Sequence, residues 1–279
     1  MNSMAKSESS SRIVTSVVAV ISAAALAVSL IAAGFAACAV PDVSTKALAS
    51  VYSTDGASPF TKDELVAAAV QTKHYTIDDN DKAAVYATIA AINAQEVLAG
   101  MAGKGAPKID ATANYAAGEL SGEQVAALET AFDAASERYV LTPDAVSHLD
   151  DVFGVVQAAK WWLLAAVVAA CVGCTAAAFR GGKRLLGRVL AGAGVSVLAV
   201  FALLAAWVAI DFDGFFAQFH SLFFAAGTWT FSWDSLLICM YPPEFWVGMG
   251  AIWLVVTVAC CVVCITIGRL LRKGSTQKR

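Results

Sequence analysis

Two of the chain's three histidines stand beside long apolar runs, each with carboxylates close by. His148 precedes one run with 12 residues between, and His220 follows another with nine between. At about 1.5 Å per helical residue, the two imidazoles are expected at similar heights, where they can meet. Histidine exchanges a proton near neutral pH, so such a pair could act as a general base and a general acid. Either could also be only an amphipathic interfacial residue, and His74, beside Lys73 and Tyr75, is expected to be exposed.

A metal site is the first alternative for these side chains. His148, His220 and one aspartate would suit zinc, which takes imidazole and carboxylate ligands. The chain contains no HExxH motif and no histidine-rich cluster, however. Two CxxC pairs, at 171–174 and 261–264, lie in apolar runs without an accompanying histidine or carboxylate, where thiols act mainly as small packing residues. We therefore expect neither a metal nor another cofactor.

Nucleophilic catalysis by the protein is the second alternative, and it needs a serine or cysteine beside an activating base. The chain has no GxSxG motif. Ser147 and Ser221 adjoin the two histidines in sequence, but adjacent residues point in different directions on a helix. A histidine pair in this chain is therefore expected to work without an enzyme nucleophile.

Membrane spans must position the two histidines. The residues are 58% hydrophobic and only 15% charged, with a mean hydropathy of +0.66, well outside the usual range for a soluble domain. About 20 apolar residues cross the hydrocarbon core as a helix. Four runs qualify and contain no Asp, Glu, Lys or Arg, so they lack the ionisable residues typical of ion-coupled transporters. We predict an all-α membrane protein with transmembrane helices at 13–40, 161–179, 189–210 and 246–268.

Charges flanking the four runs predict their orientation. Eleven basic residues and a single acid, Glu8, fall on one side, whereas eight basic residues and 21 acids fall on the other. The positive side is cytoplasmic, which places segments 1–12, 180–188 and 269–279 inside a multi-pass protein of the cell membrane. The acidic outer face argues against nucleic acid as a partner. The eleven basic residues are Lys6, Arg12, Arg180, Lys183, Arg184, Arg188, Arg269, Arg272, Lys273, Lys278 and Arg279.

Residues 41–147 have soluble composition and predict a mainly helical extracytoplasmic cap. Capping boxes start at Thr61 and Ser121, and a Gly- and Ala-rich loop is expected over 100–118. Because the helices are Ala-rich and weakly amphipathic, we expect a small cap packed on the membrane domain rather than a large independent core. The predicted helices lie near 62–73, 80–99 and 122–139.

The two segments that carry His148 and His220 have different character. Thr142 and Pro143 start a helix as N-cap and first residue, and 148–179 is predicted to form an interfacial approach that continues into the second span. Segment 211–245 has 11 aromatic residues and no Lys or Arg. Aromatic rings favour the headgroup level of a bilayer, so this segment is predicted to be an interfacial or re-entrant element.

Sequence motifs around both histidines resemble those of the bacterial lipoprotein intramolecular transacylase (Lit) family of four-span integral membrane proteins. The resemblance is close over residues 145 to 268, whereas 41 to 141 carries no motif of the family. The motifs are SHLDDV at 147–152, DFDGFF at 211–216, FHSLFF at 219–224, WDSLLI at 233–238 and PEF at 243–245.

The resemblance implies an acyltransferase whose active site lies at the extracytoplasmic junction of cap and membrane. Members of the family move the sn-2 acyl chain of a diacylglyceryl-cysteine to that cysteine's own α-amino group, which gives the lyso form. The implied partners are diacylated bacterial lipoproteins, as substrate, and membrane lipids. No cofactor is implied. A different class also remains open: a non-catalytic or differently specific membrane protein that binds a lipid or protein partner through its outer cap.

The same resemblance places the family's two catalytic histidines on His148 and His220. We expect His148 to be the base and His220 the acid or carbonyl polariser, although the roles could be exchanged. Asp151, one turn from His148, could orient its imidazole or could only face water. The expected supporting or substrate-binding residues are Asp151, Asp211, Phe216, Phe219, Phe224, Trp229 and Asp234.

Overall fold

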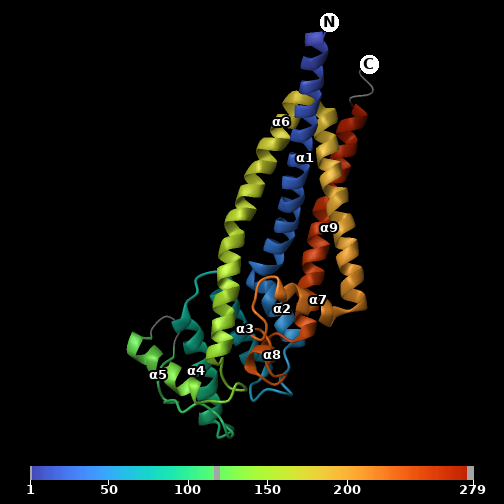
Figure 1. The fold of residues 1–279 in the computed structure, drawn as a ribbon. Coiled ribbons are helices and arrows are strands. Elements are labelled where there is room, and N and C mark those ends of the chain that lie inside the picture. The colour runs from blue at the N-terminus through green and yellow to red at the C-terminus, as the bar shows by residue number, and fades with distance from the viewer. Residues whose placement is uncertain (1, 116–119, 275–279) are drawn as a thin grey trace. The chain divides into compact units, whose positions relative to one another are not determined.

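The computed structural model describes residues 2–115 and 120–274, with side chains from residue 12 on. Within these ranges all regular secondary structure is helical, as predicted, and comprises nine helices (Figure 1). The chain divides into two compact units. The long-helix unit comprises Met1–Ala37, Ala159–Phe215 and Ala251–Arg279, and the short-helix unit comprises Cys38–Ala158 and Phe216–Gly250.

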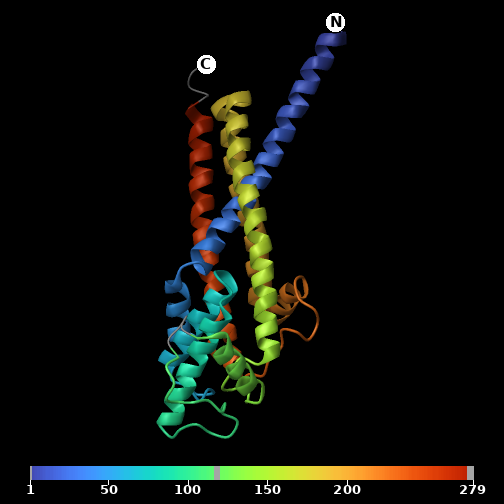
Figure 2. The ribbon, with the colours of Figure 1, turned by 90° about the vertical axis from the view of Figure 1, so that its left-hand side faces the viewer.

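Among the described residues, three helices are long and apolar enough to cross a membrane: α1 (Asn2–Ala39), α6 (Pro143–Ile210) and α9 (Pro243–Gly274). Two of the four predicted spans fall within α6, and the loop predicted between them is helical except at Gly182, with φ 60° and ψ −163°. This left-handed conformation suits glycine, which has no β-carbon. In both views the ribbon of α6 reverses direction in its yellow part (Figures 1 and 2). The predicted tail is helical as far as Gly274, and 275–279 lie outside the described residues.

Small residues let the long helices approach closely. A β-carbon added to Gly268 on α9 would lie 2.6 Å from the carbonyl oxygen of Gly187 on α6. One added to Gly173 on α6 would lie 2.3 Å from Oγ of Ser22 on α1. Small residues at such contacts are typical of helix packing in membranes, where water supplies no hydrophobic driving force between helices.

The short-helix unit contains α2 (Asp42–Tyr52), α3 (Lys62–Ile77), α4 (Lys82–Leu98), α5 (Gly122–Asp133) and α8 (Leu236–Met240). Both predicted capping boxes are confirmed, at Thr61 and at Ser121. Helix α2 was not predicted, and α5 ends at Asp133 rather than near 139 because residues 134–139 form turns. Of the predicted loop, 100–115 is irregular apart from turns, and 116–118 lie outside the described residues.

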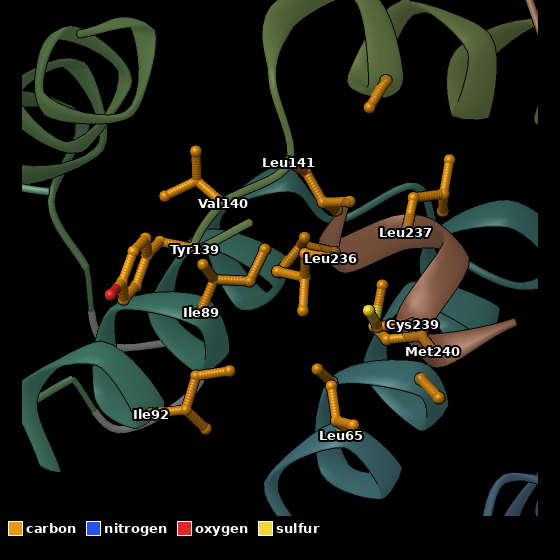
Figure 3. Packing of buried hydrophobic residues seen from close by; sticks show 14 of the residues in the cluster. Leu65, Ile89, Ile92, Tyr139, Val140, Leu141, Leu236, Leu237, Cys239 and Met240 are labelled. Atoms are coloured by element: carbon orange, nitrogen blue, oxygen red, sulfur yellow. The ribbon is translucent and has the colours of Figure 1, made fainter. Parts of the chain in front are cut away.

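A buried hydrophobic core holds the short-helix unit together, and it is larger than the weak amphipathicity of its Ala-rich helices predicted. Helix α8 supplies much of its centre, since Leu236, Cys239 and Met240 are completely buried. These side chains lie among residues of α3 and α4 and of the irregular stretch that ends at Leu141 (Figure 3). The backbone N–H of Leu236 donates to the carbonyl of Glu137, which fixes α8 against this stretch.

Helices α6 and α7 carry the two histidines of interest. The start of α6 is as predicted: Pro143 is its first residue, and the hydroxyl of Thr142 accepts a hydrogen bond from the N–H of Ala145 at 3.3 Å. Helix α7 (Phe212–Ser221) follows α6 directly. A carboxylate oxygen of Asp211 accepts a hydrogen bond from the N–H of Gly214 at 2.8 Å, which satisfies one free amide at the start of α7.

Candidate active site

The structure brings His148 and His220 together in the short-helix unit, as their spacing from the apolar runs predicts. The centroids of the two imidazole rings lie 6.3 Å apart, with an angle of 29° between the ring planes. His148 projects from the first turns of α6, and His220 lies in the last turn of α7. One small functional group of a substrate could therefore contact both rings.

His148 is buried, with 8% of its surface exposed. Its ring contacts Phe224 and Phe231, at centroid distances of 4.9 and 5.8 Å. The pKa of His148 is lowered to about 4, mainly by burial and further by the nearby charge of protonated His220, whereas the carboxylate of Asp151 opposes both effects. Among the described residues, no hydrogen-bond partner reaches Nδ1 of His148. At neutral pH this imidazole is uncharged and has an unused ring nitrogen.

The tautomer of His220 follows from its own helix. Nδ1 of His220 lies 2.8 Å from the carbonyl oxygen of Phe216. Because a carbonyl only accepts hydrogen bonds, Nδ1 carries the proton, and in the neutral ring Nε2 keeps its lone pair. Burial lowers the pKa of His220, while the hydrogen bond to Phe216 favours the protonated ring and raises it. Nε2 of His220 is therefore the nitrogen available to accept a proton.

Aromatic rings surround His220. Phe216 and Trp229 are nearest, with ring centroids at 4.0 and 4.7 Å, followed by Phe224 at 5.7 Å and Phe219 at 5.8 Å. Phe224 contacts both histidine rings. The four predicted aromatic residues are thus gathered at the histidine pair. The sequence did not identify Phe231 as a site residue, because nothing local distinguishes it from the other aromatics of its segment.

The acidic residues expected at the site occupy different positions. Asp151 is exposed, and its charge acts on His148 through space. Asp234 forms an ion pair with Arg138, whose Nε lies 3.4 Å from it. Asp211 belongs to the long-helix unit and caps α7. Asp211 and Asp234 therefore contact other groups of the protein and not the histidine pair.

His74 is less exposed than the sequence predicted. It is about one-third exposed, and its Nε2 lies 2.8 Å from a carboxylate oxygen of Asp42, at the start of α2. Asp42 also pairs with Lys73, which is buried. The hydrogen bond from His74 is the main cause of the lowered pKa of Asp42. His74 thus belongs to a charged cluster that joins α2 to α3.

The donor atoms present define what the site can bind. In the part of the chain that the structure describes, no three His, Cys, Asp or Glu side chains are grouped so as to hold a metal ion. Segment 211–245, which supplies most of the rings, contains no Lys or Arg. The histidine pair therefore offers neutral nitrogens and aromatic surface rather than a cationic site for a phosphate.

Comparison with known proteins points to one family. The family model described as lipoprotein intramolecular transacylase Lit matches residues 113–246, a range that contains both histidines and the aromatic segment. The match begins further toward the N-terminus than the resemblance at 145–268 and ends at the start of the fourth predicted span. No curated protein matches the chain by sequence.

Solved structures of the membrane-integral lipoprotein intramolecular transacylase Lit from Bacillus cereus have a similar fold. One has a TM-score of 0.65 and 15% identity, with 95% of this chain and 98% of that chain covered. Two histidine variants of that protein, one to arginine and one to alanine, each have a TM-score of 0.64 and 14% identity. The arginine variant covers 100% of this chain and 99% of its own, and the alanine variant covers 99% and 100%. The two folds therefore correspond over almost their entire lengths.

Proposed function

We propose that this chain is a member of the lipoprotein intramolecular transacylase (Lit) family of acyltransferases and acts on diacylated bacterial lipoproteins. It moves the sn-2 acyl chain of the diacylglyceryl-cysteine to the α-amino group of the same cysteine, which gives the lyso form. The observation that carries the proposal is the pair of neutral histidines within a group of aromatic rings. The centroids of the two imidazole rings lie 6.3 Å apart. Amine and ester belong to one molecule, so the reaction needs no enzyme nucleophile.

His220 acts as the base in this proposal, and His148 polarises the carbonyl. The hydrogen bond from Nδ1 of His220 to Phe216 leaves Nε2 free to take a proton from the substrate ammonium. His148, whose pKa is about 4, is the weaker base and remains neutral. Its N–H can donate to the ester carbonyl. The geometry thus favours the exchange of the roles expected from sequence.

The proposed transfer balances as follows. After His220 has taken one proton from the ammonium, the amine nitrogen attacks the sn-2 ester carbon and forms a C–N bond. The carbonyl oxygen carries the negative charge of the tetrahedral intermediate. When the C–O bond to the glyceryl oxygen breaks, that oxygen takes the proton from protonated His220. The nitrogen then loses its second proton to the neutral imidazole of His220, which releases it to water. The products are an amide and a free sn-2 hydroxyl.

Confinement by the aromatic rings supplies the remaining advantage. Holding amine and ester together in one geometry can give effective molarities on the order of 10⁵ M or more. Phe216, Phe219, Phe224 and Trp229 lie close enough to His220 to shape such a site. Since segment 211–245 has no basic residue, an uncharged diacylglyceryl group suits it better than a phospholipid headgroup does. Membrane lipids then act as surroundings rather than as the acyl donor.

The proposal includes a four-span topology. Helix α6 has 68 residues and would be about 100 Å long if straight, over three times the hydrocarbon thickness of about 30 Å. We propose that it supplies two spans, 161–179 and 189–210, that are joined near Gly182 on the cytoplasmic side. With α1 and α9 the chain then crosses the cytoplasmic membrane four times. Both termini are cytoplasmic, and the short-helix unit is an extracytoplasmic cap that carries the active site.

Mass spectrometry of lipoprotein N-termini tests the reaction. The protein is expressed in a host that makes only diacylated lipoproteins, and the N-acyl lyso form is expected to appear. His148→Ala and His220→Ala should each lower the amount of this product strongly. His74→Ala changes the same residue type in the charged cluster that joins α2 to α3, and it should leave the amount unchanged. Absence of the product with the wild-type chain, or wild-type amounts of it in both site variants, would contradict the proposal.

A further inference from the structure

We propose that the indole N–H of Trp229 is a catalytic hydrogen-bond donor, which binds the carbonyl oxygen of the acyl group and stabilises the charge that develops on it. The inference rests on the proposed function for the identity of the substrate. It adds a third group to the histidine pair: a second donor to the carbonyl oxygen, beside the N–H of His148, while His220 handles the proton.

The first observation is a buried donor without an acceptor. Nε1 of Trp229 is buried, and none of the described residues accepts a hydrogen bond from it. Buried indole N–H groups usually find a partner, because burial without one loses the hydrogen bond to water. By contrast, the indole of Trp253 in the long-helix unit donates to the carbonyl of Ile31 at 3.0 Å. Trp229 is therefore suited to a partner that arrives with the substrate.

The second observation is the place of this donor. The ring of Trp229 lies 4.7 Å from that of His220, with 31° between the planes. The ring centroid of His148 lies 6.3 Å from that of His220. Nδ1 of His148 is also buried, and no described residue pairs with it. Trp229 and His148, each with a buried ring nitrogen that no described residue pairs with, thus both lie close to the ring of His220. The indole N–H of Trp229 is therefore a donor at the histidine pair.

The chemistry of indole selects the class of ligand. An indole N–H only donates, so its partner must be an acceptor such as a carbonyl or an oxyanion, and it cannot bind the substrate ammonium. Unlike histidine, indole does not titrate in the working range of pH, so the donor is present throughout. Donors aimed at the oxygen on which charge develops are among the largest contributions to catalysis of acyl transfer.

The backbone around Trp229 holds the ring in place. Gly227 has a φ of 87°, in the left-handed region that favours glycine. The backbone N–H and the hydroxyl of Thr228 both donate to the carbonyl of Ala225, at 3.3 and 3.0 Å. This turn immediately precedes Trp229. The turn therefore fixes the backbone from which the indole projects, and the rings of Phe216 and His220 contact the indole itself.

Kinetics of Trp229→Phe in lipid nanodiscs provides the first test, with a synthetic diacylated lipopeptide as substrate. Phenylalanine keeps an aromatic ring but lacks the donor, so kcat is expected to fall about 10²- to 10³-fold while KM changes little. Trp233→Phe is the matched control, because Trp233 is 74% exposed, and it should keep wild-type activity. A Trp229→Phe enzyme with kcat within about threefold of wild type overturns the inference.

A binding measurement keeps the inference testable if Trp229→Phe does not fold. Full-length protein labelled with ¹⁵N-tryptophan is titrated with a diacyl lipopeptide whose α-amine is acetylated, so that no transfer can follow. Each of the other tryptophans is changed singly to phenylalanine, as in Trp233→Phe, and the indole resonance that remains in all these spectra is that of Trp229. This proton is expected to move downfield as the hydrogen bond forms. If other resonances show binding while this one does not move, Trp229 is not a donor.

The two measurements separate this inference from the proposed function. If wild-type protein makes no N-acyl product but the Trp229 resonance still responds to the acetylated lipopeptide, the reaction is wrong and the carbonyl site stands. If the product forms, depends on both histidines and is made equally fast by Trp229→Phe, the reaction stands and the role of Trp229 is wrong.

Discussion

At the scale of single residues, the protonation of His148 is the most direct test of the site. Burial is the main cause of its low pKa, of about 4, so the ring should remain neutral at pH 5 to 6. We expect ¹⁵N spectra of histidine-labelled protein, assigned with His148→Gln, to show one protonated and one bare ring nitrogen there. Two protonated nitrogens on His148 at pH 6 would contradict this account of its burial.

The same pKa predicts a loss of stability in acid. The unfolded chain takes up a proton on His148 at about pH 6.5, whereas the folded chain does so only near pH 4. The folded state is therefore destabilised as pH falls from about 6.5 toward 4, and this effect is absent above that range. His148→Gln should lose less stability than wild type over this interval in detergent. Equal losses would show that another group controls acid sensitivity.

His220 is expected to reveal its role through the pH dependence of its alanine variant. Without the base, transfer depends on the fraction of substrate amine that is already neutral, and an α-amino group has a pKa of about 7.7 to 8.0. Residual activity of His220→Ala should therefore rise with pH up to about 8, whereas that of His148→Ala, which keeps the base, should not. The opposite pair of profiles would assign the base to His148.

At the scale of elements, Asp211 has a structural role as the cap of α7, which does not require that it contact the substrate. Its carboxylate accepts the hydrogen bond from Gly214, where an added β-carbon would collide with it. Asp211→Asn should keep activity, because asparagine caps helices as well as aspartate does, and Asp211→Ala should cost about 0.5–2 kcal/mol and lower activity. Asp213→Asn, in the same turn, is the control. Loss of activity in Asp211→Asn would instead indicate a need for the charge.

The close approach of α6 and α9 gives a second prediction about elements. A β-carbon on Gly268 would lie 2.6 Å from the carbonyl oxygen of Gly187 and 2.9 Å from the N–H nitrogen of Ala191, and backbone atoms cannot turn aside. Gly268→Ala should destabilise the protein by about 1–3 kcal/mol in thermal unfolding in detergent. Gly192→Ala should be neutral or slightly stabilising, because no atom of another described residue, apart from the backbone of its own helix, lies within 4 Å of the added β-carbon. Equal effects of the two changes would refute this packing.

At the scale of the whole molecule, the proposed topology places Gly182 and both termini on the same side of the membrane. A reporter that fluoresces only in the cytoplasm should be active when fused after Lys183 or at the C-terminus, and inactive when fused after Lys108. A reporter that works only outside should show the reverse pattern. Cytoplasmic activity after Lys108, or its absence after Lys183, would contradict the four-span arrangement.

Much of this architecture could be predicted because it depends on local properties of the chain. The apolar runs predict long helices from about 20 neighbouring residues at a time. The capping boxes at Thr61 and Ser121 predict helix starts from four residues each. Helix α2 was missed because its N-cap residue, Pro41, offers no side-chain hydrogen bond to signal a start. The core was underestimated because α8, a single short turn of helix, fills a space that only the packed unit creates.

The sequence by itself determined that His148 and His220 lie at similar distances from apolar runs and that aromatic residues accompany them. Only the tertiary structure decided which rings contact them, that Phe216 fixes the tautomer of His220, and that no described residue accepts a hydrogen bond from the indole nitrogen of Trp229. The reason is physical. Hydropathy and helix capping sum over neighbouring residues, whereas desolvation and hydrogen-bond satisfaction depend on side chains that meet only after folding.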